Sequence, residues 1–415
     1  MSGESGKNER LENRGPLRGL KGLEWTNTIA GSYCGKLLAD FGVEVLKIER
    51  PRAGDDARIA GPFPGDVPNP EASGLFLFLN TNKLGITLEV ADPLGKEIFD
   101  RLCRQADLLI VDSQTRGNPD HPVFTEWTEK FPKLIVVVLT PYGLSSPQKH
   151  YAANELTVMH ESGVAYYTPG DAEDGEKEMP LQLPGHQAEF MGGMNGATAG
   201  MLAVLHRKRT GRGQIVDVAL RDGPLLSNIW NMGYLAYTGE KPTRMKGDVT
   251  LAPQHVVPCK DGYIQLSCGE EAHWQKFLSV IGNPQWGNRE IFKDRFERGR
   301  NWETLLPLIT ESLREWGKKE ITEAGQKAGV PITPVNTAGD IFKDRHLAER
   351  GFFCEVDLPP SGRLKMPGRP FIMGKSPWQL RRRAPTLGEH NEEIFVRRLG
   401  LSREELISMK KMGVI

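Results

Sequence analysis

A cluster of charged side chains follows the second predicted strand of the chain. Glu49 is followed by Arg50, Arg52 and Arg58. An acidic residue at this place binds a ribose hydroxyl in dinucleotide enzymes, whereas guanidinium groups pair with phosphate oxygens. The cluster therefore favours a phosphorylated ribose, such as the adenosine 3′-phosphate of coenzyme A (CoA). A solvated basic edge that binds no ligand is the alternative.

The loop after the first predicted strand lies where an open α/β sheet binds its ligand. Residues 26–35 read Thr-Asn-Thr-Ile-Ala-Gly-Ser-Tyr-Cys-Gly and lack the Gly-x-Gly-x-x-Gly spacing of a dinucleotide site. The loop also departs from a P-loop, because Ala30 replaces the first glycine and Leu37 stands where Ser or Thr would hold magnesium. NAD and ATP are therefore disfavoured as ligands.

The elements around these residues alternate between strand and helix. Hydrophobic runs predict strands at residues 23–26, 43–48, 84–90, 107–112, 134–139 and 214–220. Helices are predicted at 32–41, 125–131 and 189–207, and a further one begins at Pro93 behind the N-cap Asp92. This alternation predicts a large α/β domain with an open, doubly wound, Rossmann-like parallel sheet.

Three glycines recur along one face of the helix predicted at 189–207. Gly192, Gly196 and Gly200 are spaced by four residues. The spacing predicts close packing against a neighbouring element, and close approach of a ligand to the backbone is the alternative.

The pattern changes after about residue 238. A hairpin at 255–267 and helices at 271–281, 302–316 and 319–328 predict a smaller α+β domain. We expect a polar leader at 1–18, the first part of the large domain at 19–225, and an inserted small domain at 226–335. Residues 336–415 should then return to the large domain and end in a helix at 403–412.

Composition limits the partners of the chain. The 53 basic residues balance 53 acidic ones, so no overall field attracts nucleic acid or an anionic membrane. The five cysteines are scattered and predict reduced thiols, without a disulfide framework or a metal site. The first twenty residues lack the apolar core of a secretory signal, and the apolar segment 190–205 is too short to span a membrane. We expect a cytoplasmic protein.

Several motifs carry a resemblance that covers nearly the whole chain. They read Leu-Leu-Ala-Asp-Phe-Gly-Val-Glu-Val-Leu-Lys-Ile-Glu-Arg at 37–50, Asn-Lys-Leu-Gly-Ile-Thr-Leu at 82–88, Leu-Pro-Gly-His-Gln-Ala-Glu-Phe-Met-Gly-Gly at 183–193, Thr-Gly-Arg-Gly-Gln at 210–214 and Pro-Thr-Leu-Gly-Glu-His-Asn at 385–391. Together they resemble the class III (family III) CoA-transferases of the CaiB/BaiF type, which include formyl-CoA:oxalate and carnitine CoA-transferases and the acyl-CoA racemases. The resemblance implies an interlocked homodimer that transfers CoA from an acyl-CoA to a carboxylic acid and holds no tightly bound cofactor.

The resemblance also implies a nucleophile. In that family an aspartate at the start of the helix before the Thr-Gly-x-Gly-Gln turn attacks the thioester, and Glu189 stands at this place. A glutamate can form the same mixed anhydride and enzyme-bound CoA thioester, aided by the helix N-terminus. Its extra methylene is a departure that shifts the carboxylate. A glutamate that only complements the helix dipole, in a catalytically silent CoA-binding homologue, is the alternative.

A second acidic residue matches the family upstream. Glu155 corresponds to a glutamate beside the active site, and the resemblance implies that it orients the nucleophile or the acyl group; a helix-capping role is the alternative. The racemases carry a His-Asp pair where this chain has Asn154 and Glu155, so racemisation or isomerisation is disfavoured. His186 is a further candidate for lining the site.

The resemblance places CoA phosphate contacts at Arg50, Arg52 and Arg58. It places adenine contacts at Ile29, Ala30, Gly31, Leu88, Ala91, Asp112 and Ser113. The glycine-rich lid of some family members has only Gly247 as a counterpart within 245–252, so either other residues shield the anhydride from water or the lid is absent.

Overall fold

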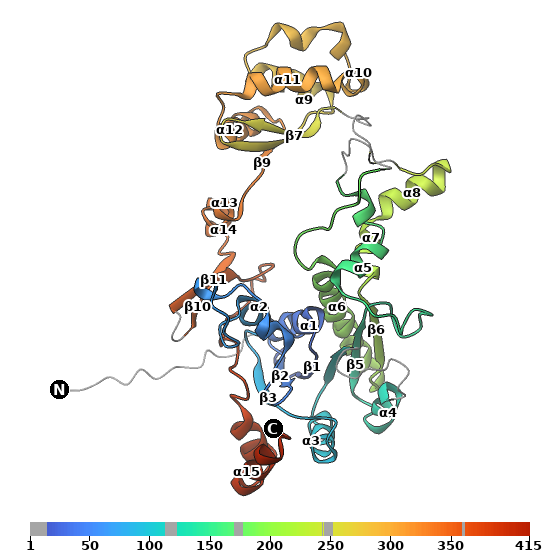
Figure 1. The fold of residues 1–415 in the computed structure, drawn as a ribbon, viewed down its shortest axis with the longest axis vertical. Helices are drawn as coiled ribbons and strands as arrows, with labels where there is room; N and C mark the ends of the chain where they lie inside the picture. Colours follow the sequence, from blue (N-terminus) through green and yellow to red (C-terminus); the bar gives the residue numbers. More distant parts are fainter. Residues whose placement is uncertain (1–14, 113–122, 170–176, 243, 245–251, 359–361) are drawn as a thin grey trace, which may run out of the picture. The chain divides into compact units, whose positions relative to one another are not determined.

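The computed structural model describes residues 15–112, 123–169, 177–242, 244, 252–358 and 362–415 (Figure 1). The chain divides into a large unit, Met1–Ala165, Gln182–Trp230 and Ala348–Ile415, and a small unit, Tyr166–Leu181 and Asn231–Leu347. The chain passes from the large to the small unit after residue 230 and back after residue 347, whereas the expected boundaries were after 225 and 335. Residues 166–181 group with the small unit, which local sequence patterns did not indicate. No helix among the described residues is long and apolar enough to cross a membrane.

A six-stranded parallel sheet forms the centre of the large unit. The strands are β1 (Lys21–Trp25), β2 (Glu44–Glu49), β3 (Leu84–Thr87), β4 (Leu108–Asp112), β5 (Ile135–Thr140) and β6 (Ile215–Ala219). Their order is β3-β2-β1-β4-β5-β6, and every neighbouring pair is parallel. This confirms the predicted sheet, although β3 is shorter than expected. Because the strand order reverses between β1 and β4, a crevice is expected at their carboxyl ends.

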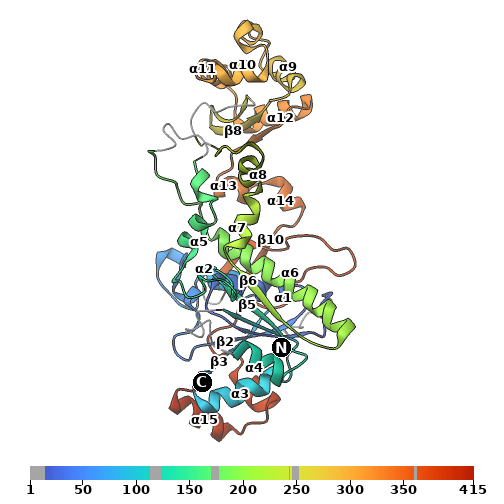
Figure 2. The ribbon, with the colours of Figure 1, turned by 90° about the vertical axis from the view of Figure 1, so that its right-hand side faces the viewer.

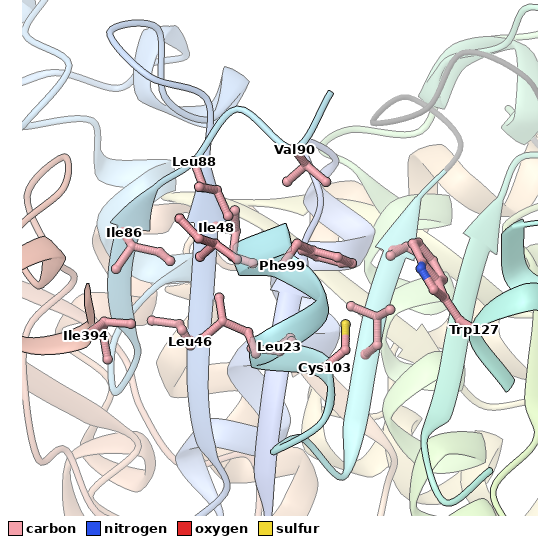
Figure 3. Packing of buried hydrophobic residues seen from close by; sticks show 14 of the residues in the cluster. Leu23, Leu46, Ile48, Ile86, Leu88, Val90, Phe99, Cys103, Trp127 and Ile394 are labelled. Carbon is pink, nitrogen blue, oxygen red and sulfur yellow. The ribbon is translucent and has the colours of Figure 1, made fainter. Parts of the chain in front are cut away.

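Helices cover both faces of this sheet (Figures 1 and 2). On one face lie α3 (Pro93–Cys103), α4 (Val123–Lys130) and α15 (Arg403–Met412), whose core with the strands includes Ile48, Phe99, Trp127 and Ile394 (Figure 3). On the other face lie α1 (Ile29–Asp40), α5 (Glu155–Glu161) and α6 (Gln187–Thr210). The predicted N-cap of α3 is confirmed, because the Asp92 carboxylate accepts from the amide of Leu94 at 2.8 Å.

The glycines of α6 allow this helix to lie close to α1 and to the sheet. A Cβ atom on Gly193 would stand 2.6 Å from the carbonyl oxygen of Ala30, and one on Gly192 would stand 2.2 Å from the Leu220 side chain. A Cβ atom on Gly196 would lie 3.3 Å from the Cys34 sulfur. The helix-packing interpretation of the glycine spacing therefore holds, and the close approach brings the first turns of α1 and α6 together.

The remaining elements are shorter. The large unit also contains α2 (Gly74–Leu79), α7 (Asp222–Ser227) and an antiparallel hairpin of β10 (Phe353–Leu358) and β11 (Gly362–Pro367); α8 (Ile229–Thr238) and α14 (Arg345–Glu349) span the divisions between the units. The small unit contains an antiparallel sheet of β7 (Gln254–Cys259), β8 (Gly262–Ser267) and β9 (Ile332–Pro334) with α9 (Glu271–Val280), α10 (Arg295–Arg300), α11 (Trp302–Leu313), α12 (Lys318–Ala328) and α13 (Ala338–Phe342). The hairpin, α9, α11 and α12 confirm the predictions for this region.

Candidate active site

Glu189 lies in the first turn of α6 and reaches the first turn of α1. Its Oε2 atom accepts a hydrogen bond of 2.7 Å from the backbone amide of Ala30. The amides of a first helical turn have no partner within their own helix, and they carry the positive end of the helix dipole. The half-buried Glu189 carboxylate therefore lies at the N-termini of two helices.

The start of α1 leaves a donor open for this contact. Thr28 is the N-cap of α1, and its hydroxyl accepts from the amide of Gly31 at 3.1 Å. The amide of Ala30 is then satisfied by Glu189. Because the helix begins at Ile29 rather than at the predicted residue 32, the loop is shorter than expected and the helix N-terminus itself faces Glu189.

Asp112 fixes the loop before α1 from the end of the neighbouring strand β4. Its buried Oδ2 atom accepts from the amides of Asn27 at 2.8 Å and Thr28 at 2.9 Å. The Oδ2 atom of Asp112 thus holds the backbone of the loop before α1. The paired expectation for Ser113 lies outside the described residues.

Glu155 caps the helix that carries Glu189. It is the first residue of α5, which begins with a capping box formed by Asn154 and Thr157. The two Glu155 carboxylate oxygens accept from the amides of Ala188 and Glu189, each at 3.0 Å. These bonds replace the side-chain cap that His186, the N-cap residue of α6, does not provide. The structure thus gives Glu155 the capping role, and this role fixes the backbone of Glu189.

The surroundings of Glu189 favour its protonated form. Burial is the main cause, the nearby charges of Asp112 and Glu155 add to it, and the hydrogen bond from Ala30 opposes it; together they raise the pKa of Glu189 to about 7. Within the described ranges, no Lys, Arg or His side chain forms an ion pair with Glu189. In the same part of the chain, no group of three or more His, Cys, Asp or Glu residues is arranged to hold a metal ion.

The residues expected to contact adenine differ in accessibility. Ala30 and Gly31 are buried in the first turn of α1, and Ile29 is half-buried at its start. Leu88 is buried in the core of the α3 face, as Figure 3 shows. Ala91 is exposed. The turn 88–91 can therefore offer Ala91 to a ligand, but not the Leu88 side chain.

Arg58 does not lie at an open phosphate site. Its guanidinium is 1% exposed and forms a bidentate pair with Glu49, with Nε and Nη2 at 2.7 Å and 2.9 Å from the two carboxylate oxygens. Its Nη1 atom donates to Glu71 at 2.9 Å, and Nη2 also donates to the carbonyl oxygen of Pro385 at 3.1 Å. Every guanidinium nitrogen thus has a protein acceptor, so this geometry argues against the expected phosphate contact. The arginine cluster in the sequence did not reveal which member is buried.

Arg50 and Arg52 are both exposed just after β2. The guanidinium of Arg50 donates to the carbonyl oxygen of Gly54 at 3.0 Å and pairs with Asp56. Arg52 adopts a left-handed backbone conformation with φ 65°. These two side chains are accessible to an anionic ligand.

A buried charge network lies behind the start of α1, and sequence reasoning missed it. The network consists of Glu24, Lys47, Asp55 and Lys83, all at most 1% exposed. The Lys47 ammonium lies 2.7 Å from Glu24, 2.6 Å from Asp55 and 3.1 Å from the Ser32 hydroxyl. The Lys83 ammonium lies 2.6 Å from Glu24 and 2.7 Å from the Ser32 carbonyl oxygen. Charged residues inside the apolar strands β1 and β2 were the available signal.

The fold and the site together define a doubly wound α/β protein that holds a half-buried carboxylate at the point where its strand order reverses. The sequence matches the profile of CoA-transferase family III over residues 17–391, so the chain belongs to this family and is a CoA-transferase. The resemblance inferred from the motifs is confirmed.

Curated relatives and solved structures match over most of the chain. The succinate–glutarate CoA-transferase of Agrobacterium fabrum is 29% identical over 388 residues, which cover 92% of this chain and 95% of the relative. A subunit of the succinyl-CoA:(R)-benzylsuccinate CoA-transferase of Thauera aromatica is 30% identical over 408 residues, covering 93% and 95%. A crystal structure of a CaiB/BaiF family protein from Brucella suis matches with a TM-score of 0.80 at 26% identity, covering 92% of this chain and 99% of that one.

Proposed function

We propose that this CoA-transferase moves CoA from an acyl-CoA to a free carboxylic acid through covalent intermediates on Glu189. The observation that carries the proposal is the position of the Glu189 carboxylate, half-buried at the N-termini of α1 and α6 and bonded to the amide of Ala30. Above its pKa of about 7, the Glu189 side chain is an ionised carboxylate that forms no ion pair with a described Lys, Arg or His side chain, so its oxygens are available as nucleophiles.

The first half of the reaction transfers CoA to the enzyme. An oxygen of Glu189 attacks the thioester carbonyl carbon of the acyl-CoA, the carbon–sulfur bond breaks, and CoA leaves as a thiolate. The product on the enzyme is a mixed anhydride. The thiolate then attacks the side-chain carbonyl carbon of Glu189, which forms a glutamyl-CoA thioester and releases the donor acid as its carboxylate.

The second half reverses these steps with the acceptor acid. The acceptor carboxylate attacks the glutamyl thioester, CoA leaves again, and a new anhydride forms. The thiolate attacks the acyl carbon derived from the acceptor, which yields the new acyl-CoA and restores the Glu189 carboxylate. Each step exchanges one oxyanion or thiolate for another, so no oxidant and no net proton is required.

Two features of this chain support Glu189 as a nucleophile in place of the family aspartate. The bond from Ala30 fixes one carboxylate oxygen of the longer side chain. The Glu155 carboxylate holds the amides of Ala188 and Glu189, so the backbone from which that side chain extends is also fixed. The Ala30 amide is further placed to stabilise the oxyanion that develops when the Glu189 carbonyl is attacked.

The CoA nucleotide is proposed to bind at the carboxyl end of the sheet. Arg50 and Arg52 are the proposed phosphate ligands, because both are exposed after β2. Ala91 is the proposed adenine contact. Ala30, Gly31 and Leu88 are left out because they are buried, and Ile29 because it directly precedes Ala30, whose amide binds Glu189. Arg58 is left out because its guanidinium is occupied.

We also propose that the chain acts in the cytoplasm as an interlocked homodimer. Exposed apolar side chains of the large unit support a partner surface: Leu202, Leu205, Leu226, Ile229 and Trp230. Trp230 is 81% exposed, which is costly for a side chain of this size in a monomer. Light scattering should give twice the chain mass, and a monomer at micromolar concentration would refute the dimer.

Mass spectrometry tests the covalent mechanism. The protein is incubated with an acyl-CoA and then digested, and the peptide that contains Glu189 is expected to carry CoA as a thioester that hydroxylamine removes. Turnover without any adduct, together with an active Glu189→Gln variant, would refute the mechanism. Exchange of the α-proton of the acyl group with solvent, without an adduct, would indicate the racemase alternative. CoA binding with neither signal would indicate a catalytically silent homologue.

A further inference from the structure

A half-buried apolar surface includes the sequence neighbours of Glu189 and of Ala30. We call it the aromatic patch; it consists of Ile29, Tyr33, Phe78 and Phe190. Phe190 directly follows Glu189, and Ile29 directly precedes Ala30, whose amide holds the Glu189 carboxylate. The patch is therefore connected to the nucleophile through both helices that position it.

The three aromatic rings contact one another. The rings of Tyr33 and Phe190 meet edge to face at 4.7 Å between centroids, and the Phe78 ring lies 6.4 Å from Tyr33 and 6.3 Å from Phe190. Tyr33 follows Ala30 by about one helical turn, or roughly 5 Å along the axis of α1. The backbone of Tyr33 thus lies about one turn of α1 away from the Ala30 amide that binds the Glu189 carboxylate.

The patch differs from the core on which it rests. Phe76 is 1% exposed and Leu79 is 0% exposed, whereas all members of the patch keep part of their surface accessible. A cluster of partly exposed aromatic rings next to a reactive group is typical of a surface that binds an apolar ligand.

The charge near the patch is already neutralised. The Lys36 ammonium lies 4.8 Å from the centre of the Phe78 ring. It is, however, bonded to the Thr81 hydroxyl at 2.7 Å and paired with Asp40 at 3.0 Å, and its side chain is 3% exposed. This cation is therefore not available to bind the second carboxylate of a dicarboxylic acid.

We infer that the aromatic patch binds the hydrocarbon body of the acyl group, and that the enzyme acts on acids with a branched or aromatic apolar body in preference to short dicarboxylic acids. The inference rests on the proposed function, because an acyl group bonded to Glu189 must place its next few atoms close to this carboxylate. A relative named for succinate and glutarate acts on acids that carry a second charge. An apolar wall beside which Lys36 is already paired with Asp40 disfavours such a charge.

An exchange assay tests this selectivity for one acid at a time. Each acyl-CoA is incubated with the isotopically labelled form of its own acid, and label entering the thioester is measured. The acids are succinate, glutarate, isovalerate, phenylacetate and 3-phenylpropionate. We expect kcat/KM for the best apolar acid to exceed that for succinate by about tenfold or more.

Substitutions in the patch link the selectivity to these residues. Phe190→Ser and Tyr33→Ser are each expected to reduce the ratio of apolar to dicarboxylic kcat/KM by about tenfold. Phe190→Leu, which keeps an apolar side chain, should retain most of the ratio, and Tyr33→Ser carries the test if Phe190→Ser does not fold. Phe371→Ser is the matched control, because Phe371 is 50% exposed and stacks on Phe41 at the opposite end of α1. It should leave the ratio unchanged.

The possible outcomes separate this inference from the proposed function. A CoA adduct on Glu189 with a ratio that favours succinate, or with a ratio that Phe190→Ser leaves unchanged, overturns the inference alone. If Phe190→Ser raises KM equally for all acyl-CoAs, the patch binds the pantetheine arm of CoA. If Phe190→Ser has the mass of a monomer and an unchanged ratio, the patch binds a second copy of the chain. Either result also overturns the inference. Absence of the Glu189 adduct with every acyl-CoA overturns the proposed function.

Discussion

Two groups of carboxylates lie beside α1, and they differ in their partners: one group is paired with lysine side chains, and the other is bonded to backbone amides. In the buried charge network, Glu24 and Asp55 are paired with Lys47 and Lys83. Burial opposes the ionisation of Asp55, but the attraction of Lys47 outweighs it, and the pKa of Asp55 falls below its usual range. Burial, only partly offset by Glu24, lowers the pKa of Lys83 to about 8. The two carboxylates and the two ammonium groups thus balance one another's charge within the network.

At the active site, backbone amides replace the cations. Glu189 accepts from Ala30, and Glu155 accepts from Ala188 and Glu189. The pKa of Glu189 rises to about 7, chiefly because burial is not balanced by a paired charge. The comparison indicates that a buried carboxylate paired with lysine stays ionised, whereas a carboxylate held only by helix amides keeps a raised pKa.

The largest effect is expected from removing the reactive carboxylate. Glu189→Gln keeps the size of the side chain but cannot form the anhydride, so turnover should fall by at least roughly 1,000-fold. The measurement is steady-state transfer between an acyl-CoA and an acid. Glu44→Gln, the same change at an exposed glutamate paired with Arg398, is the control and should retain activity. A loss below tenfold in Glu189→Gln would contradict the role of Glu189.

The buried charge network should respond in stability rather than in chemistry. Lys47→Met leaves Glu24 and Asp55 without a shared cation in a buried place, so the free energy of unfolding should fall by roughly 3–5 kcal/mol. Urea unfolding measures this change. Lys130→Met removes an exposed partner of Asp100 and should cost less than about 1 kcal/mol. Equal effects of the two substitutions would remove the distinction between buried and exposed pairs.

Glu155→Gln sharpens the comparison at the active site. Glutamine has one accepting oxygen, and its NH2 group cannot accept from the second backbone amide, so the backbone of Glu189 is held less firmly and kcat should fall by roughly tenfold. Removal of the Glu155 charge should also lower the pKa of Glu189, and the rise of activity with pH should move to lower pH.

A matched control separates this effect from a general loss of a helix cap. Glu405→Gln alters the capping box of α15, where the Glu405 carboxylate accepts from the amide of Ser402 at 2.7 Å. Glu405→Gln should change the free energy of unfolding about as much as Glu155→Gln does, but it should not move the pH profile of activity. An unchanged pH profile in Glu155→Gln would show that its charge does not act on Glu189.

The smallest effect concerns stability and pH. A carboxyl whose folded-state pKa is raised from 4.5 to about 7 binds more protons when folded, so wild-type stability should decline as pH rises through this interval. Glu189→Gln lacks this decline, so its free energy of unfolding at pH 8 should exceed that of wild type by roughly 1–3 kcal/mol. Thermal unfolding at pH 8 should accordingly give a higher midpoint for the variant. The difference should vanish below about pH 4.5. A variant less stable than wild type at pH 8 would show that the raised pKa is wrong.

Elements with clear periodicity were predictable from the sequence. The strands β1, β2, β4 and β5 and the helices α3 and α15 were located closely, because hydrophobic spacing and capping residues mark them locally. Short elements such as α2, β9 and the hairpin of β10 and β11 were missed. The formation of α2 and β9 depends on contacts with residues far away in the chain, which no local pattern records. The hairpin was missed although its two strands pair with each other.

The candidate site was predicted in part. The motif around Glu189 identified the residue, and Glu155 was placed beside it with two interpretations, of which the structure supplies the capping geometry. Arg58 was expected to bind a phosphate but is buried against Glu49, and the inward direction of Asp112 was not foreseen. A row of arginines indicates positive charge but not which member faces solvent, because burial is set by the packing of distant elements.

The sequence by itself determined the alternating α/β pattern, the family and the position of the acidic residue at the start of α6. Only the tertiary structure decided which carboxylates are neutralised by lysine and which are held by amides. The physical reason is that charge pairing depends on distances of a few ångströms between Glu24, Lys47 and Lys83, or between Glu189 and Ala30. Folding brings these residues together from separate elements of the chain.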